Sequence, residues 1–243
     1  NKLPDIQIRE LFNIWDKFSI FATIQEKKII FCTITEIKSK KSSENTNKYR
    51  IMHYIETERL ILRHFTDKDA NALFTILSDE DVNKFLPMFP LKSIEETKTY
   101  IQNRYTAKYT QNKGFYYAIC LKENDIPMGY VHISEDDSHD LGYGIKKEFW
   151  HQGICTEACR AVIDILKQTD TPYITATHDI NNPRSGKVMQ ALGMKYQYSY
   201  EELWQPKNIL VTFRMYQLNF DNQEDRIYKK YWDTYPIHFI EEI

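Results

Sequence analysis

Glycine is scarce in this chain. Only 7 of the 243 residues are glycine, all of them lie between Gly114 and Gly193, and four fall between Gly129 and Gly153. Because glycine tolerates left-handed backbone and close approach to a ligand, its distribution directs attention to the segment that ends at Gly153.

Metal-ligand spacings and long apolar runs are also lacking. The four cysteines (Cys32, Cys120, Cys155 and Cys159) follow no metal-binding pattern, so we expect reduced thiols in a cytoplasmic protein without a metal site. No apolar run approaches the roughly 18 residues of a membrane span, and the first residues do not form a signal peptide. A net charge of −2 gives no general attraction to nucleic acid or to a membrane surface.

The first 51 residues differ from the rest of the chain. Residues 8–18 could form a short amphipathic helix, residues 20–25 and 28–35 are strand-like, and residues 38–49 form a polar linker. Met52 resembles the natural start of the next domain. We interpret residues 1–51 as an accessory segment that packs on the main body; a domain-pairing arm and an upstream extension without a catalytic part are the alternatives.

Residues 52–220 have a regular pattern of elements. Thr66 caps one helix, Ser93 and Glu96 form a capping box for another, and Pro183 and Gly193 mark the start and end of a late helix. Helices are expected at 67–77, 93–109, 156–168 and 183–192, and strands at 60–65, 115–121, 128–134, 141–145, 173–177, 196–200 and 209–218. The order from Leu60 is βααβββαβαββ, which indicates an α/β fold.

The loop that contains Gly153 joins a strand to a helix. Such a loop directs several unpaired N–H groups to one place, with the positive end of the helix dipole behind them. This arrangement binds phosphate groups. Gly142 and Gly144, in the strand before the loop, indicate a bulge or close packing.

Two motifs in this order of elements resemble the GNAT N-acetyltransferase superfamily. The first is Trp150-His151-Gln152-Gly153-Ile154-Cys155 followed by Thr-Glu-Ala, and the second is NPRSGKVMQALGM over residues 182–194. Trp150 stands where the superfamily motif has Arg or Gln, and Cys155 where it has Gly or Ala. The stretch ETERLILR near Met52 is similar to the ribosomal-protein N-terminal (RimJ/RimL-type) acetyltransferases. The resemblance covers about residues 53–220.

The resemblance implies a mixed, mostly antiparallel central sheet flanked by helices, and acetyl-CoA as the cofactor. It implies that the coenzyme is bound by Ile145, His151, Gln152, Gly153, Ile154, Cys155, Thr156, Asn182 and Ser185. It also implies direct attack of an amine on the thioester in a ternary complex, without a metal. Ser185 would protonate the leaving sulfur. Glu202 is the chosen candidate for the general base, with Glu201, Glu135, Asp136 or a water-mediated base as alternatives.

The acceptor implied is a primary amine, either a peptide N-terminus or a small molecule such as an aminoglycoside or a polyamine. Its specificity is expected to depend on residues 79–92, with Phe85, Met88 and Phe89, and on residues 201–208. A non-catalytic acyl-CoA sensor and a scaffold are the other classes of function. The aromatic tail, residues 221–243, is expected to pack on its own domain or on a dimer partner, so the protein would be a monomer or a homodimer.

Overall fold

The computed structural model describes residues 54–111 and 114–243. The elements expected within residues 1–51, at 8–18, 20–25, 28–35 and 38–49, lie outside the described residues. Among the described residues, no helix has both the length and the apolar character to cross a membrane.

A five-stranded antiparallel sheet forms one half of the described structure. Its order follows the chain, so that each strand pairs with the next. The connections are short except between β2 and β3, where the early helices are inserted. The strands are β1 (Tyr54–Glu56), β2 (Leu60–Arg63), β3 (Phe115–Leu121), β4 (Pro127–Ile133) and β5 (Leu141–Ile145). β3 and β4 are buried along most of their length, because helices cover both faces of the sheet.

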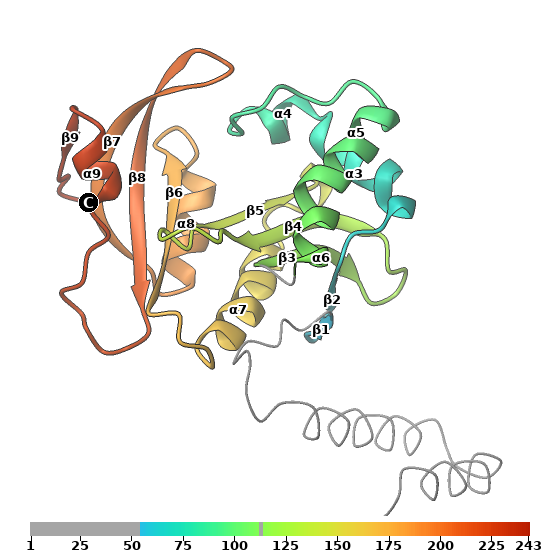
Figure 1. Ribbon diagram of the computed structural model, residues 1–243, viewed down its shortest axis with the longest axis horizontal. Helices are drawn as coiled ribbons and strands as arrows, with labels where there is room; N and C mark the ends of the chain where they lie inside the picture. The colour runs from blue at the N-terminus through green and yellow to red at the C-terminus, as the bar shows by residue number, and fades with distance from the viewer. Residues whose placement is uncertain (1–53, 112–113) are drawn as a thin grey trace, which may run out of the picture. The chain divides into compact units, whose positions relative to one another are not determined.

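Helices pack on the two faces of this sheet, which creates two apolar cores (Figure 1). On one face, α3 (Ala70–Leu77) and α5 (Ile94–Ile101) contribute Leu73, Ile76 and Ile101 to one core. On the other face, α7 (Ile154–Leu166) and α8 (Pro183–Ala191) contribute to the second core, where Val162 and Met189 lie. Fully burying a side chain of this size stabilises the fold by about 1.5–3 kcal/mol.

A second antiparallel sheet has the order β6-β8-β7-β9. Its strands are β6 (Tyr173–Asp179), β7 (Lys195–Trp204), β8 (Ile209–Asn219) and β9 (His238–Phe239). The two sheets meet at one parallel bridge, between Asp140 and Thr175. The predicted mixed, mostly antiparallel sheet is thus confirmed, as two sheets joined at that bridge.

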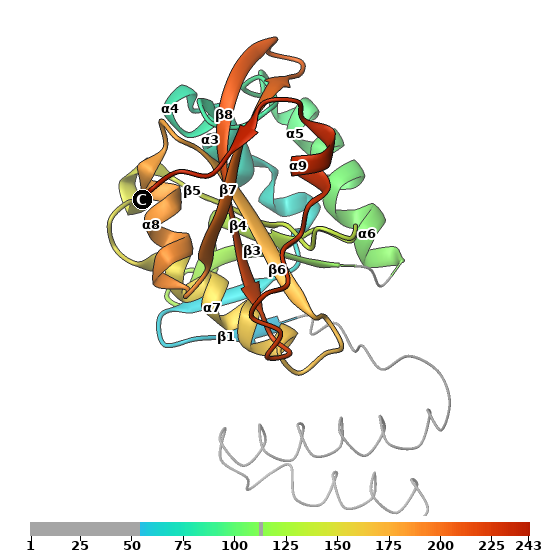
Figure 2. The ribbon, with the colours of Figure 1, turned by 90° about the vertical axis from the view of Figure 1, so that its left-hand side faces the viewer.

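The C-terminal segment (residues 221–243) lies against the second sheet (Figure 2). It contains α9 (Lys230–Thr234) and β9, which pairs with β7. Tyr228 is buried with Tyr198 in an aromatic cluster that also includes Trp232, and the Tyr228 backbone carbonyl accepts a 2.7 Å hydrogen bond from the Tyr198 hydroxyl. This packing shields most of the aromatic side chains of the segment from water.

The order of elements from Leu60 is as predicted, and the differences lie at boundaries and in short elements. α7 begins at Ile154 and not at Thr156, because Gly153 takes the N-cap position. The helix predicted at 93–109 contains a π-helical turn at 102–106 between α5 and α6 (Ala107–Thr110). The helix predicted at 67–77 begins with a 3-10 turn, Asp67–Asp69. The short elements β1, α4 (Glu80–Asn83), α9 and β9 were not predicted, nor was the 3-10 turn Lys147–Phe149.

The predicted helix signals are mostly present. Thr66 and Asp69 form a reciprocal capping box. Ser93 accepts a hydrogen bond from the Glu96 amide, but the Glu96 carboxylate accepts from the Lys92 amide, so the box predicted there is only half formed. Gly193, at φ +82°, follows α8, and its amide and that of Met194 bond to the carbonyls of Gln190 and Met189. These two bonds form a Schellman motif.

Candidate active site

The site lies where β5 and β6 separate. The strands run parallel and are bridged only at Asp140 and Thr175. On its other edge β5 pairs with β4, where the Lys146 amide donates to the Met128 carbonyl. Because backbone bonds alternate between the two edges of an antiparallel strand, the N–H and C=O groups of Tyr143 and Ile145 point into the gap. The Ile145 carbonyl accepts from Trp150 Nε1 at 3.1 Å.

A cavity of about 890 Å³ occupies this gap and the space beside it. Nine of the ten predicted site residues line it: Ile145, His151, Gly153, Ile154, Cys155, Thr156, Asn182, Ser185 and Glu202. Gln152 does not, because its side-chain amide turns back to the Glu148 carbonyl. Of the predicted specificity residues, Phe85 and Met88 line the cavity, whereas Phe89 is 56% exposed and does not. The structure therefore brings together residues that lie up to about 120 positions apart.

The start of α7 provides unpaired backbone donors at one end of the cavity. Gly153 has φ +74°, and a side chain there would have only Arg59 Nη2, at 3.8 Å, within contact distance. The amide of Glu157 bonds to the Gly153 carbonyl, whereas the amides of Ile154, Cys155 and Thr156 precede the first intrahelical bond, as in any helix. Helix N-termini with open approach bind phosphate groups.

Arg59 and Glu157 hold this loop in place. Glu157 Oε1 accepts from Thr57 Oγ1 at 2.5 Å and from the Arg59 amide at 3.0 Å, and Oε2 accepts from Arg59 Nε at 2.7 Å. Arg59 Nη1 also donates to the Gln152 carbonyl at 3.1 Å. Burial opposes ionisation of Glu157, but these hydrogen bonds outweigh it and lower its pKa. The stretch ETERLILR and the Thr-Glu-Ala stretch are thus in direct contact.

The two glycines of β5 allow β4 side chains to lie across the strand. A Cβ at Gly144 would lie 2.6 Å from Tyr130 Cζ, and one at Gly142 would lie 2.3 Å from His132 Cε1. Tyr130 and His132 both line the cavity. Of the two alternatives that the sequence left open, close packing is the one observed at these positions.

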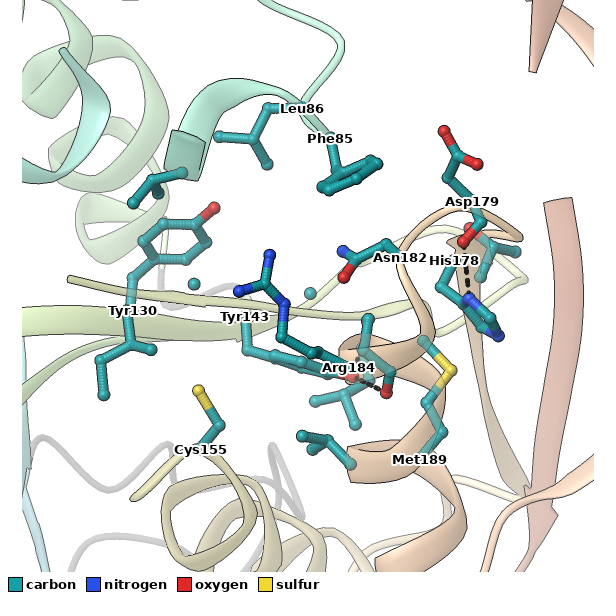
Figure 3. A pocket seen from close by; sticks show the side chains of 18 of the residues that line it. Phe85, Leu86, Tyr130, Tyr143, Cys155, His178, Asp179, Asn182, Arg184 and Met189 are labelled. Atoms are coloured by element: carbon teal, nitrogen blue, oxygen red, sulfur yellow. Dashed lines mark hydrogen bonds between the residues drawn. The ribbon is translucent and has the colours of Figure 1, made fainter. Parts of the chain in front are cut away.

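Ser185 lies in the first turn of α8, opposite Tyr143 of β5. The Tyr143 hydroxyl donates to the Ser185 carbonyl at 2.8 Å and lies 2.9 Å from Ser185 Oγ. Burial raises the pKa of Tyr143, so both hydroxyls are neutral at pH 7. Figure 3 shows Tyr143, Asn182 and Arg184 together in the middle of the cavity, between Phe85 and Leu86 on one side and Cys155 and Met189 on the other.

Cys155 also lines the cavity, next to these hydroxyls. Burial raises its pKa to about 12. Because the thiolate is the nucleophilic form of cysteine, burial disfavours the reactive form of this side chain.

Acidic and tyrosine side chains gather at the end of the cavity near β7. Glu202 is partly buried; burial raises its pKa, and a hydrogen bond from the Tyr235 hydroxyl partly offsets this. Asp140, at the bridge between the sheets, also lines the cavity. Burial raises its pKa to about 7. Of the other bases considered, Glu201, Glu135 and Asp136 do not line the cavity.

Sequence reasoning did not find several of the lining residues. Tyr143, Asp140, Tyr231 and Tyr235 have no motif around them, and the last two become part of the cavity only because the C-terminal segment lies along β7. The one available signal was the density of aromatic residues in that segment. Within the described ranges, 54–111 and 114–243, no group of three or more His, Cys, Asp or Glu side chains could hold a metal ion.

Two antiparallel sheets that separate beside a glycine-led helix start define the fold of an acetyltransferase domain, and comparisons with known proteins agree. The family model described as an acetyltransferase (GNAT) domain matches residues 59–195, which is more than half of the chain. The chain therefore belongs to the GNAT acetyltransferase family, and the predicted family and enzyme class are confirmed.

Several relatives and solved structures similar to this chain are acetyltransferases by name. The chain is 26% identical over 157 residues to the uncharacterized N-acetyltransferase YoaA of Bacillus subtilis, covering 60% of this chain and 88% of that one. A GNAT-family acetyltransferase from Bacillus anthracis superposes with a TM-score of 0.61 at 23% identity, covering 69% and 99%. RimL, a ribosomal L7/L12 alpha-N-protein acetyltransferase in complex with coenzyme A, gives a TM-score of 0.61 at 17% identity, covering 69% and 98%.

Proposed function

We propose that this protein transfers an acetyl group from acetyl-CoA to a primary amine, by direct attack of the amine in a ternary complex. One observation carries the proposal. The unpaired amides at the start of α7, the free edge of β5 and the hydroxyl of Ser185 all face the same cavity. A coenzyme with a diphosphate, an amide-containing arm and a thioester needs these three features in this order along its length.

The residues present fit acetyl-CoA. The surroundings of Gly153 leave the backbone open to a diphosphate, and Thr156 and His151 lie beside it. The N–H and C=O groups of Tyr143 and the N–H of Ile145 can pair with the amides of the pantetheine arm, as an added strand would. Asn182 lies at the same gap. When bound, acetyl-CoA supplies an activated acetyl group.

The chain's own groups would then hold and move protons. Glu202, whose pKa is raised by burial, can accept the proton that the acceptor ammonium loses. An amide in the gap can stabilise the oxyanion. Ser185 can donate a proton to the leaving sulfur, with Tyr143 2.9 Å from its Oγ.

A thiol-release assay with acetyl-CoA over a panel of amines tests the proposal, together with calorimetry of coenzyme A binding. Ser185→Ala is expected to lower kcat by about 10²–10⁴ while leaving coenzyme affinity within a few fold. Ser78→Ala is the matched control, because Ser78 ends α3 and does not line the cavity. Absence of coenzyme binding by folded protein would refute the proposal. Binding without turnover of any amine would instead indicate a sensor.

A further inference from the structure

We propose that the C-terminal segment completes an acceptor pocket for a compact primary amine with an apolar or aromatic body, whose ammonium group binds at Asp140. This inference rests on the proposed function and specifies the substrate class of the same cavity.

The ammonium site is indicated by a buried carboxyl oxygen that has no hydrogen-bond partner. Asp140 lines the cavity, and its Oδ1 is buried without a hydrogen-bond partner among the described residues. An unpaired buried acceptor is costly, and a bound N–H donor would remove that cost. Asp136 and Arg104 are the charged groups that act on Asp140. Tyr143, Tyr200 and Tyr231 are the titratable neighbours that sense its charge.

A second carboxyl, Glu202, lines the same cavity and lies beside the C-terminal segment, since Tyr235, which follows α9, acts on its pKa. Tyr200 of β7 senses the charges of both Glu202 and Asp140. The proposed ammonium site at Asp140 and the proposed base Glu202 are thus both near this tyrosine.

Three tyrosines of β7 and the C-terminal segment form a stack. The Tyr200 ring centroid lies 5.1 Å from that of Tyr231 and 4.9 Å from that of Tyr235, with interplanar angles of 15° and 13°. All three line the cavity. Aromatic rings also attract a cation within about 6 Å. Since two of the three rings come from the C-terminal segment, that segment forms part of the acceptor wall.

The opposite wall is apolar. Phe85, Leu86, Met88, Tyr100 and Tyr130 line the cavity on the side of α4 and α5, and Figure 3 shows Phe85 and Leu86 on the same side as the Tyr130 hydroxyl. A second cationic group on the acceptor would find no acidic partner among these five side chains. The wall therefore favours an acceptor with an apolar body over a polyamine or an aminoglycoside.

Hydrogen bonds between the β7–β8 turn and α4 connect the tyrosine wall to the apolar wall. Lys207, in the turn between β7 and β8, donates to the Asn83 carbonyl at 2.8 Å and to Asn83 Oδ1 at 3.1 Å. Asn83 belongs to α4 and is 1% exposed. Asp81, also in α4, pairs with Lys147 just after β5. These contacts hold α4 over the cavity and restrict the acceptor to a compact molecule rather than the N-terminus of a folded protein.

Kinetics of a matched pair of variants test the role of the C-terminal segment. Tyr235→Phe removes the hydroxyl that lies beside Glu202 in this wall, so we expect kcat/KM for the acceptor to fall about tenfold or more, with the KM for acetyl-CoA unchanged. Tyr228→Phe is the control, because its hydroxyl binds Asp137 and the side chain does not line the cavity. Asp140→Asn and Asp137→Asn form a second pair with the same expectation. Equal effects within both pairs would overturn the proposal.

A substrate panel tests the class of acceptor. Phenethylamine, spermidine, kanamycin and an eight-residue peptide with an N-terminal serine would be compared in the thiol-release assay, alongside calorimetry of coenzyme A binding. We expect phenethylamine to give the highest kcat/KM. A higher value for any of the other three overturns this inference but leaves the proposed function standing. Failure to bind coenzyme A overturns both.

Discussion

At the residue scale, Ser185 depends on Tyr143 for its orientation. The tyrosine hydroxyl contacts both the carbonyl and the hydroxyl of Ser185, and it comes from the neighbouring strand and not from the same helix. The proposed proton donor is therefore held across the gap between β5 and α8. Tyr143 acts through Ser185 in this arrangement, as a positioning residue.

Replacing Tyr143 with Phe should lower kcat by up to about tenfold, because one neutral hydrogen bond is worth about 0.5–1.5 kcal/mol. Coenzyme affinity should stay within a few fold. Steady-state kinetics and calorimetry measure the two effects, with Ser185→Ala as the reference. A loss as large as that of Ser185→Ala would mean that Tyr143 itself supplies the proton, and the positioning role would be wrong.

Alanine substitutions at two glycines separate the effects of close packing and of backbone strain on stability. Gly142→Ala places a Cβ 2.3 Å from His132 Cε1, so we expect overpacking to cost about 1–3 kcal/mol. Gly193→Ala meets nothing within 4 Å, but its φ of +82° should cost about 1 kcal/mol. Chemical unfolding measures both. If Gly142→Ala were the milder variant, the contact between His132 and β5 would not constrain the strand.

The motif residues of the site could be predicted from the sequence, whereas their partners could not. Gly153, Asn182 and Ser185 belong to local patterns with a recognisable spacing, and all three line the cavity. Asp140 forms the bridge just before β5 and Tyr143 lies within β5, and only the separation of β5 from β6 directs them to the cavity. A local sequence pattern contains no information about where two neighbouring strands separate.

At the element scale, the turn between β1 and β2 supports the start of α7. Thr57 and Arg59 bind Glu157 on the first helical turn, and Arg59 also binds the loop before it. The loop that faces the proposed diphosphate is thereby fixed by an element about 90 residues away in the sequence. A rigid loop loses less conformational entropy when it binds.

Glu157→Gln should therefore weaken coenzyme A binding several fold and destabilise the fold by about 1–3 kcal/mol, because three hydrogen bonds lose their charged acceptor. Glu224→Gln is the control. Its ion pair with Lys195 is 3.3 Å long, and both side chains are more than 70% exposed, so its contribution should be below about 1 kcal/mol. Calorimetry and urea unfolding at pH 7 compare the two, and indistinguishable variants would show that the turn does not support the loop.

The types of the long elements could be predicted, and the short ones could not. β3, β5 and α8 have strong apolar patterns or clear end signals, and the first two have the predicted bounds. α4, α9 and β9 span two to five residues each. Segments this short contain less than two helical turns or one pair of facing residues, so tertiary contacts decide their conformation.

At the scale of the whole molecule, the two sheets meet at a bridge that buries a carboxyl. Asp140 keeps its place through backbone contacts, since its amide bonds to Ser134 Oγ at 2.8 Å and its backbone bridges to Thr175. Its buried Oδ1 has no hydrogen-bond partner among the described residues. The ionisable group at the bridge between the sheets therefore lines the cavity at a cost in folding free energy.

Asp140 at this bridge should make the stability of the protein depend on pH. Burial raises the pKa of Asp140 from 3.8 to about 7, so the folded state binds the proton more tightly than the unfolded chain does. Between about pH 4 and pH 7 the unfolded chain releases this proton first, and the free energy of unfolding should fall by about 1.4 kcal/mol per pH unit from this group. The loss should be complete above pH 7.

Asp140→Asn isolates the contribution of this group, because the amide keeps the shape of the side chain but does not titrate. The variant should be more stable than the parent at pH 8, and the difference should disappear as the pH falls towards 4. Urea unfolding of both proteins at several pH values measures this difference directly, while carboxylates such as Glu157, whose pKa is lowered, affect the two proteins equally. A difference that stays constant with pH would show that Asp140 has an ordinary pKa, and that the end of the cavity near β7 is open to water.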